Sequence, residues 1–118
     1  MRKKTSTNFE NDRFLELNCP FITTLRFIGK RWKPAVLWKI NNGFVRFNQL
    51  KKELPYISDK MLSDTVAELE TDGIIQKKVF DEIPLRVEYN VTEFGKGLLP
   101  VLSEMDKWGE QTIKKIKL

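Results

Sequence analysis

The sequence predicts a mainly α-helical (α+β) fold in which a β-hairpin separates several short helices from a long terminal helix. Three observations carry this prediction. Apolar residues recur at helical spacing from residue 19 to residue 73, alternate with polar residues over residues 74–92, and return to helical spacing over residues 92–118. Two of the short helices are joined by a tight connection at residues 55–57, and the hairpin follows them directly. A helix-turn-helix followed by such a hairpin is a winged helix-turn-helix.

The composition narrows the possible functions. The 118 residues carry 21 Lys and Arg against 16 Asp and Glu, a net charge of +5, and include no histidine and one cysteine. The lack of histidine excludes Ser-His-Asp and Cys-His catalysis, and a single thiol forms neither an internal disulfide nor a multi-thiolate metal site. No apolar run approaches the ~20 residues of a membrane helix, and the basic start lacks the apolar stretch of a signal peptide. We therefore expect a cytoplasmic protein without metal, cofactor or membrane, and with an anionic partner.

The chain is predicted to begin with an arm. Residues 1–18 show no sustained period and form this N-terminal arm, while residues 19–118 form the domain. Pro20 suits the first turn of a helix that ends at Gly29. The inward face of this helix is predicted to hold Phe21, Leu25 and Ile28.

Three further helices lead to the hairpin. One is predicted over residues 32–40, with Lys33 in solvent. Residues 46–54 form an amphipathic helix, and Ser58 is a strong N-cap for the helix of residues 58–72, so these two helices are the helix-turn-helix. The residues predicted to face inward are Val36, Leu37, Ile40, Phe47, Leu50, Leu54, Leu62, Val66 and Leu69.

The hairpin and the last helix complete the domain. Residues 74–92 are predicted to form the hairpin, with Pro84 at its tip or edge. Thr92 is predicted to cap one long helix that runs to the end of the chain. Pro100 lies inside this predicted helix and is expected to bend it or break its hydrogen bonds locally.

Four residues on the exposed side of helix 58–72 are candidates to approach DNA bases. A rotation of 100° per residue turns them away from the apolar stripe, and the first turns of this helix enter the major groove in a helix-turn-helix. Lysine can donate to guanine, serine can bond several base edges, and aspartate can accept from cytosine. The alternative is the solvated face of a structural helix, which five acidic residues against one lysine favour. The candidates are Ser58, Lys60, Ser63 and Asp64.

Basic residues on neighbouring elements would hold phosphates without reading sequence. One of them, Arg86, lies near the hairpin tip and is placed to reach a minor groove. A single surface lysine is more often only a solubilising charge, so the prediction depends on the side that these residues share. The residues assigned to phosphates are Arg46, Lys51, Lys77, Lys78 and Arg86, with Lys33 and Lys52 on the same side.

The last helix carries more apolar residues than a monomer with one small core requires. Pairing with a second copy through the terminal helices, the last helix with the first as an additional contact, would cover them and place two reading helices about one DNA turn, roughly 34 Å, apart. The prediction is a homodimer on a two-fold operator, and the alternative is a helix that folds back on its own domain. The residues assigned to the dimer interface are Leu98, Val101, Leu102, Met105, Trp108, Ile113 and Ile116.

The only cysteine, Cys19, precedes Pro20 at a predicted helix start. Free backbone amides and the positive end of the helix dipole would stabilise a thiolate there, which is typical of a redox-sensing cysteine. A lone cysteine is more often a small buried apolar residue, and this alternative stays open.

Several short motifs occur in order along residues 19–109. They are CP from Cys19, IGKRW from Ile28, RFNQL from Arg46, ISDKML from Ile57, LETDG from Leu69, PLRVEY from Pro84, TEFG from Thr92 and WG from Trp108. In this combination the chain resembles the HxlR-type transcriptional regulators, a branch related to the MarR regulators of bacteria. The resemblance implies a winged-helix homodimer that binds operator DNA.

The resemblance also bears on particular residues. In several members the cysteine at the position of Cys19 responds to electrophiles or oxidants. With no second cysteine in this chain, an oxidative switch would join Cys19 of two subunits or bind a small thiol or electrophile. Two departures weaken the inherited DNA contacts, because Ala67 stands where the family often has arginine and Leu85 replaces the usual second proline of the wing turn.

The sequence therefore predicts a sequence-specific, DNA-binding transcriptional regulator that acts as a homodimer. Its predicted partners are double-stranded DNA, a second copy of the chain, and a small electrophile or thiol at Cys19. The alternative is a winged-helix protein-interaction module without DNA binding, which the acidic residues of helix 58–72 favour. An enzyme is the third alternative, because no pair of carboxylates has a pocket or partner that the sequence can name.

Overall fold

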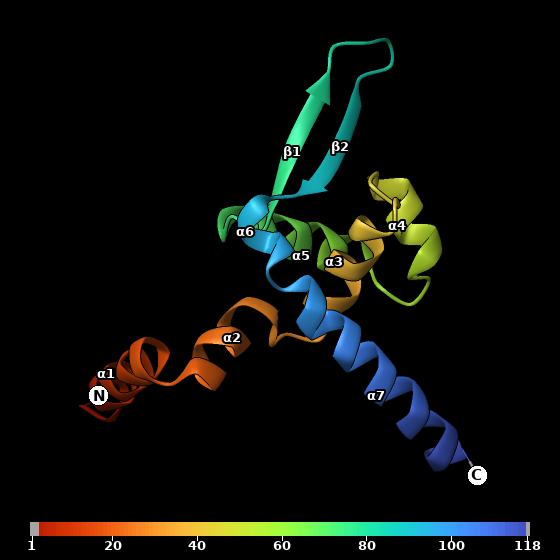
Figure 1. Ribbon diagram of the computed structural model, residues 1–118. Helices are drawn as coiled ribbons and strands as arrows, with labels where there is room; N and C mark the ends of the chain where they lie inside the picture. Colours follow the sequence, from red (N-terminus) through yellow and green to blue (C-terminus); the bar gives the residue numbers. More distant parts are fainter. Residues whose placement is uncertain (1–2, 118) are drawn as a thin grey trace.

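The computed structural model describes residues 3–117, with side chains from Glu10 onward. Its elements are α1 (Lys3–Asn18), α2 (Pro20–Ile28), α3 (Lys33–Asn41), α4 (Phe47–Glu53), α5 (Asp59–Thr71), β1 (Ile75–Phe80), β2 (Arg86–Val91), α6 (Glu93–Lys96) and α7 (Leu99–Lys117). The hairpin projects from one side of a bundle of short helices, while α1 with α2 and the long α7 diverge from the opposite side (Figure 1). This arrangement confirms the predicted fold class.

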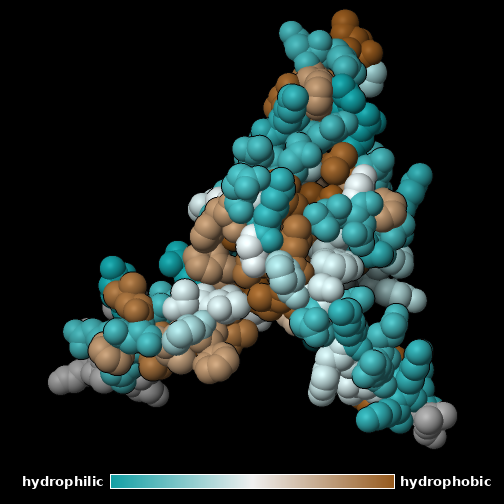
Figure 2. Space-filling model, viewed as in Figure 1, coloured by the Kyte–Doolittle hydropathy of each residue, from teal (hydrophilic) through white to brown (hydrophobic). Residues whose placement is uncertain are grey.

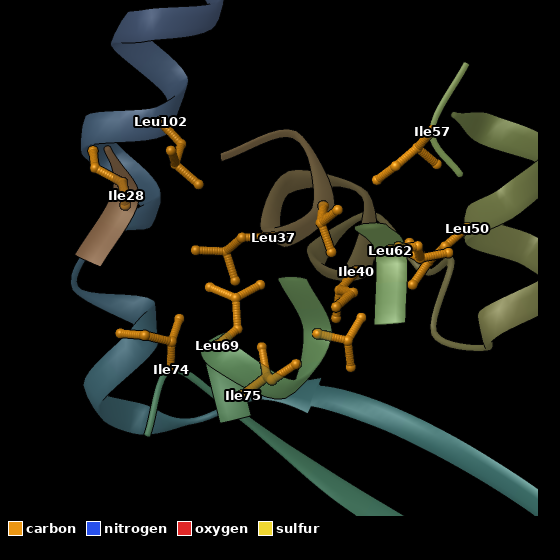
Figure 3. Packing of buried hydrophobic residues seen from close by; sticks show 12 residues of the cluster. Ile28, Leu37, Ile40, Leu50, Ile57, Leu62, Leu69, Ile74, Ile75 and Leu102 are labelled. Carbon is orange, nitrogen blue, oxygen red and sulfur yellow. The ribbon is translucent and has the colours of Figure 1, made fainter. Parts of the chain in front are cut away.

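The core lies between α3, α4, α5 and the base of the hairpin. Figure 3 shows Leu37, Leu62 and Leu69 converging there, with Ile28 and Leu102 closing the side from which the terminal helices leave. Each fully buried leucine stabilises the fold by about 2 kcal/mol. The helical spacing is confirmed, because seven of the residues predicted to face inward are buried and the other two pack partly buried against them. The seven are Val36, Leu37, Ile40, Leu50, Leu62, Val66 and Leu69, and the two are Phe47 and Leu54.

The hairpin is a regular antiparallel pair. Ile75 lies opposite Val91 at its base, and Phe80 lies opposite Arg86 near its end. Pro84 lies in the connection between the strands, as predicted. The backbone amide of Tyr89 donates to the carbonyl of Val45 at 2.9 Å, so β2 is also bonded to the segment that precedes α4. This bond fixes the wing against the helix-turn-helix.

The N-terminal segment consists of two helices, and one prediction about the second of them is wrong. Within the predicted arm, Lys3–Asn18 form the helix α1, which packs against α2. Of the predicted inward residues of α2, only Ile28 is buried, whereas Phe21 is 81% exposed and Leu25 is 55% exposed. The prediction for Phe21 and Leu25 is wrong because α2 leads away from the bundle instead of lying along it (Figure 1).

The prediction of one long terminal helix is also wrong, because the segment forms α6 and α7. Thr92 caps α6, since its hydroxyl accepts from the amide of Gly95 at 3.0 Å. A Cβ at Gly95 would lie 2.2 Å from the carbonyl oxygen of Ile74, so only glycine permits α6 to pack this closely on the chain. Pro100 lies in the first turn of α7, where its missing amide costs no helical hydrogen bond. It therefore begins α7 rather than bending it.

Lys33 contradicts its prediction most clearly, because this lysine is 1% exposed instead of lying in solvent. Its ammonium donates to the carbonyl of Arg26 at 3.2 Å and to Asp72 at 3.3 Å, and it lies 3.0 Å from a carboxylate oxygen of Glu68. Helical spacing reports only the side of a helix, and the carboxylates that surround Lys33 come from α5 and from Asp72, the C-cap residue of α5. We conclude that Lys33 ties α2, α3 and α5 together and is not available to a phosphate.

Within the residues described, none of the helices is both long enough and apolar enough to cross a membrane.

Candidate nucleic-acid interface

The second helix of the helix-turn-helix, α5, begins with a well-formed cap. The hydroxyl of Ser58 accepts a hydrogen bond from the amide of Met61 at 3.0 Å, and Ser58 itself has extended backbone angles. Burial of Leu62, Val66 and Leu69 orients the helix, so its opposite side faces solvent. The four candidate base-contacting residues, Ser58, Lys60, Ser63 and Asp64, are all exposed. The structure thus brings them together on one face.

Two of these candidates are bonded to each other. The ammonium of Lys60 donates to Oδ2 of Asp64 at 2.9 Å, one helical turn away, with side chains 85% and 60% exposed. The hydrogen bond to Asp64, followed by the attraction between the two charges, raises the pKa of Lys60. The positive lysine and the negative aspartate therefore form one exposed polar unit without net charge.

Lys51 stabilises the turn between α4 and α5. Its ammonium donates to the carbonyl of Ile57 at 2.6 Å and lies 3.0 Å from Asp59. The sequence prediction assigns Lys51 to a phosphate, whereas this geometry holds the turn and the start of α5 in place. Tyr56 in the same turn is 92% exposed beside the start of α5, and the sequence analysis missed it. A large aromatic residue between Pro55 and Ile57 is the signal that could have indicated it.

The basic residues of the wing differ in their availability. The guanidinium of Arg86 donates to Glu82 at 2.9 Å and to Glu88 at 3.1 Å, and it lies 3.7 Å from the centre of the Phe80 ring. The prediction places Arg86 in a minor groove, but here its charge is directed to these partners. Arg46 also lies 3.6 Å from Glu88.

Among the residues described, two of the five predicted phosphate contacts have no carboxylate within ion-pair distance. They are Lys77 and Lys78, both exposed on β1. The strand that follows α5 therefore offers two cations without a carboxylate partner, although the ammonium of Lys78 also lies 5.1 Å from the centre of the Phe80 ring.

The other predicted sites lie on the terminal helices, away from this face (Figure 1). Cys19 is half-buried at the N-cap of α2, where its thiol makes no capping hydrogen bond. Of the residues assigned to a dimer interface, Leu102 is buried in the chain's own core and Leu98 packs against it. Five are exposed on α7: Val101, Met105, Trp108, Ile113 and Ile116. Figure 2 shows further apolar surface along α1 and α2, where Phe14, Leu17, Phe21 and Leu25 are exposed.

A capped helix with an exposed polar face, preceded by a short helix and followed by a hairpin, defines a winged helix-turn-helix protein. The HxlR-like helix-turn-helix family matches residues 27–117, and the chain belongs to this family, which consists of transcriptional regulators. YdeP of Bacillus subtilis (strain 168), an HTH-type transcriptional regulator, is 40% identical over 109 residues, covering 92% of this chain and 84% of YdeP.

Solved structures show the same likeness. The redox regulator HypR in its oxidized form superposes with a TM-score of 0.75 at 40% identity, over 79% of this chain and 96% of HypR. The reduced form of the transcriptional regulator YodB from B. subtilis gives a TM-score of 0.67 at 35% identity, over 79% of this chain and 92% of YodB.

Proposed function

We propose that the chain is a homodimeric transcriptional regulator that binds double-stranded DNA with α5 in the major groove. The observation that carries the proposal is the exposed polar face of α5 beside Lys77 of β1, with Lys78 exposed on the opposite face of the same strand. Side chains of this face can bond base edges, while the two lysines can hold the phosphates next to the groove. The membership of the family supports the same function.

The apolar surface on the terminal helices supports the proposed homodimer. Exposed aromatic and aliphatic residues on α7 and on α1 with α2 lie on the side of the molecule away from the hairpin (Figure 1). A second copy would remove this surface from water, and a two-fold axis there would leave both α5 helices free. The expected operator is therefore two-fold, with half-sites about one DNA turn apart.

The salt dependence of binding tests the phosphate contacts. In a plot of log affinity against log salt concentration, each phosphate contact contributes about −0.9 to the slope. We therefore expect the double substitution Lys77→Gln and Lys78→Gln to make the slope less steep by about two per bound protomer. Fluorescence anisotropy with labelled duplexes selected from genomic DNA would give the slope between about 50 and 200 mM salt. The matched control, Lys114→Gln with Lys115→Gln at the end of α7, should leave it unchanged.

The alternative function makes the opposite prediction. A winged-helix protein-interaction module would show weak binding to every genomic fragment and no steep salt dependence. The acidic side chains of α5, such as Asp59 and Glu70, are the feature that favours it. Absence of salt-dependent binding by the wild-type chain would exclude the DNA-binding proposal.

We further propose that Cys19 makes the regulator responsive to oxidants. HypR is a redox regulator whose structure is known in its oxidized form. The structure of YodB is known in a reduced form and after diamide treatment. Diamide would take two electrons and two protons from a pair of thiols and leave a disulfide. The pair would be Cys19 of two subunits, or Cys19 and a small thiol. A quinone would instead form a thioether by addition of the Cys19 thiolate.

The substitution Cys19→Ser should leave DNA affinity intact and abolish its response to diamide or quinones. Anisotropy titrations before and after treatment would measure both quantities on the same protein. An unchanged response in the serine variant would end this part of the proposal.

A further inference from the structure

We propose that the Lys60–Asp64 ion pair reads a single G·C base pair, with Lys60 donating to guanine and Asp64 accepting from cytosine. The inference rests on the proposed binding of α5 in the major groove and adds a base preference to it. A carboxylate in the middle of a surface that meets DNA would otherwise oppose binding, because it faces a polyanion.

The pair keeps bonding capacity for a ligand. Its 2.9 Å hydrogen bond uses one of the three ammonium protons of Lys60 and one carboxylate oxygen, Oδ2, of Asp64. Both side chains are exposed and extend from the first two turns of α5, the part of a reading helix that contacts bases. Lys60 therefore retains two donors, and Asp64 retains acceptor positions on its second oxygen.

A G·C base pair presents the complementary pattern at its major-groove edge. Guanine O6 and cytosine N4 are joined by an N–H···O hydrogen bond of about 2.9 Å, which is the separation of the two protein atoms. Guanine N7 and O6 are two adjacent acceptors for the two remaining lysine protons. The second hydrogen of cytosine N4 points into the groove, where the free carboxylate oxygen can accept it.

An A·T base pair fits the same unit less well. The lysine would then meet thymine O4 as a single acceptor, next to the thymine methyl group. The carboxylate would meet adenine N6, and the acceptor N7 beside it would repel the second carboxylate oxygen. Because Lys60 and Asp64 lie one turn apart along the helix, their order also distinguishes G·C from C·G.

Selection of duplexes from a random pool tests the inference directly. The wild-type chain should select half-sites that contain one G·C pair at a fixed position, and Asp64→Asn should reduce discrimination at that pair about tenfold. Exchange of the two residues, Lys60→Asp with Asp64→Lys, preserves the ion pair and the net charge, and it should change the selected pair to C·G. Glu104→Gln on α7 adds the same charge as Asp64→Asn and should leave the selected motif unchanged.

The outcomes separate this inference from the proposed function. A wild-type motif without the G·C pair, or a motif that is the same in the wild type and in all variants, would overturn the base assignment while DNA binding stands. A wild-type chain that enriches no sequence and shows no salt-dependent binding would overturn the DNA-binding proposal, and the base assignment with it. Circular dichroism of each variant would show the wild-type helix content, since both side chains are exposed.

Discussion

Replacing Lys33 with methionine should lower the free energy of unfolding by about 3 kcal/mol at neutral pH. Methionine fills a similar volume but leaves Asp72 and Glu68 without the ammonium that lies 3.3 Å and 3.0 Å from them, and it leaves the carbonyl of Arg26 without its donor. The cost comes mainly from Asp72, whose side chain is only 15% exposed, and from the carbonyl of Arg26, because Glu68 is 35% exposed and keeps its ion pair with Lys30. Urea unfolding would measure the difference at one fixed protein concentration, since the stability of the proposed dimer would depend on concentration.

The chain offers a matched control in Lys30, which bonds the same Glu68 at 3.1 Å but is 70% exposed. The substitution Lys30→Met should cost less than about 0.5 kcal/mol, because a solvated ion pair contributes little. Equal effects of the two substitutions would show that burial of Lys33 does not determine the energy of this cluster.

The effect of Lys33→Met should depend on pH. Burial raises the pKa of Glu68, but the hydrogen bonds from Lys33 and Lys30 outweigh burial, so its pKa is lowered overall. A lowered pKa in the folded state stabilises the protein above the ordinary pKa of glutamate and loses this effect as the pH falls through the folded value. The difference between the wild-type and variant stabilities should therefore become smaller as the pH falls below about 4, while the part due to the lost hydrogen bond to the carbonyl of Arg26 remains.

Replacing Trp108 with alanine should weaken the proposed homodimer at least about thirtyfold, the effect of a strong interface residue. The indole is 71% exposed on α7, beside an apolar surface formed with Val101 and Met105. Burying an aromatic residue of this size against a second copy is the largest single gain that this helix offers. Sedimentation velocity over a range of protein concentrations would give the dissociation constants.

The control is Lys107→Ala, which removes an equally exposed but charged side chain from the adjacent position. It should change the dimer dissociation constant less than about twofold. A wild-type chain that remains monomeric at every concentration would contradict the dimer, and an unaffected constant in Trp108→Ala would place the interface elsewhere. Loss of the dimer should also weaken binding to two-fold operators, because each half-site would bind alone.

Local signals were enough to predict most of the winged helix. Ser58 identifies the start of α5, because a hydroxyl at that position can accept from the first free amides, and the alternation of residues 74–92 identifies the hairpin. The stripe that includes Leu62 and Leu69 also orients α5, so the exposed candidates Lys60 and Asp64 could be named in advance. These predictions depend only on residues within one element.

Whether a charged residue is free to contact DNA could not be predicted in this way. Lys51 and Arg86 resemble free surface cations in the sequence, yet each is hydrogen-bonded to groups of the chain itself. The split of the terminal segment at residues 97–98 has the same origin, because Gly95 packs against the carbonyl of Ile74, which lies 21 positions earlier.

By itself, the sequence determined the helices α2 to α5, the hairpin, the core stripe and the face of α5 that meets solvent, since each follows from the periodicity of neighbouring residues. The tertiary structure alone decided which cations are neutralised, that Lys33 is buried, and that α2 leaves Phe21 and Leu25 uncovered. The physical reason is that a side chain's charge balance and burial depend on groups that only folding brings near, whereas its direction from a helix or strand depends on its own backbone.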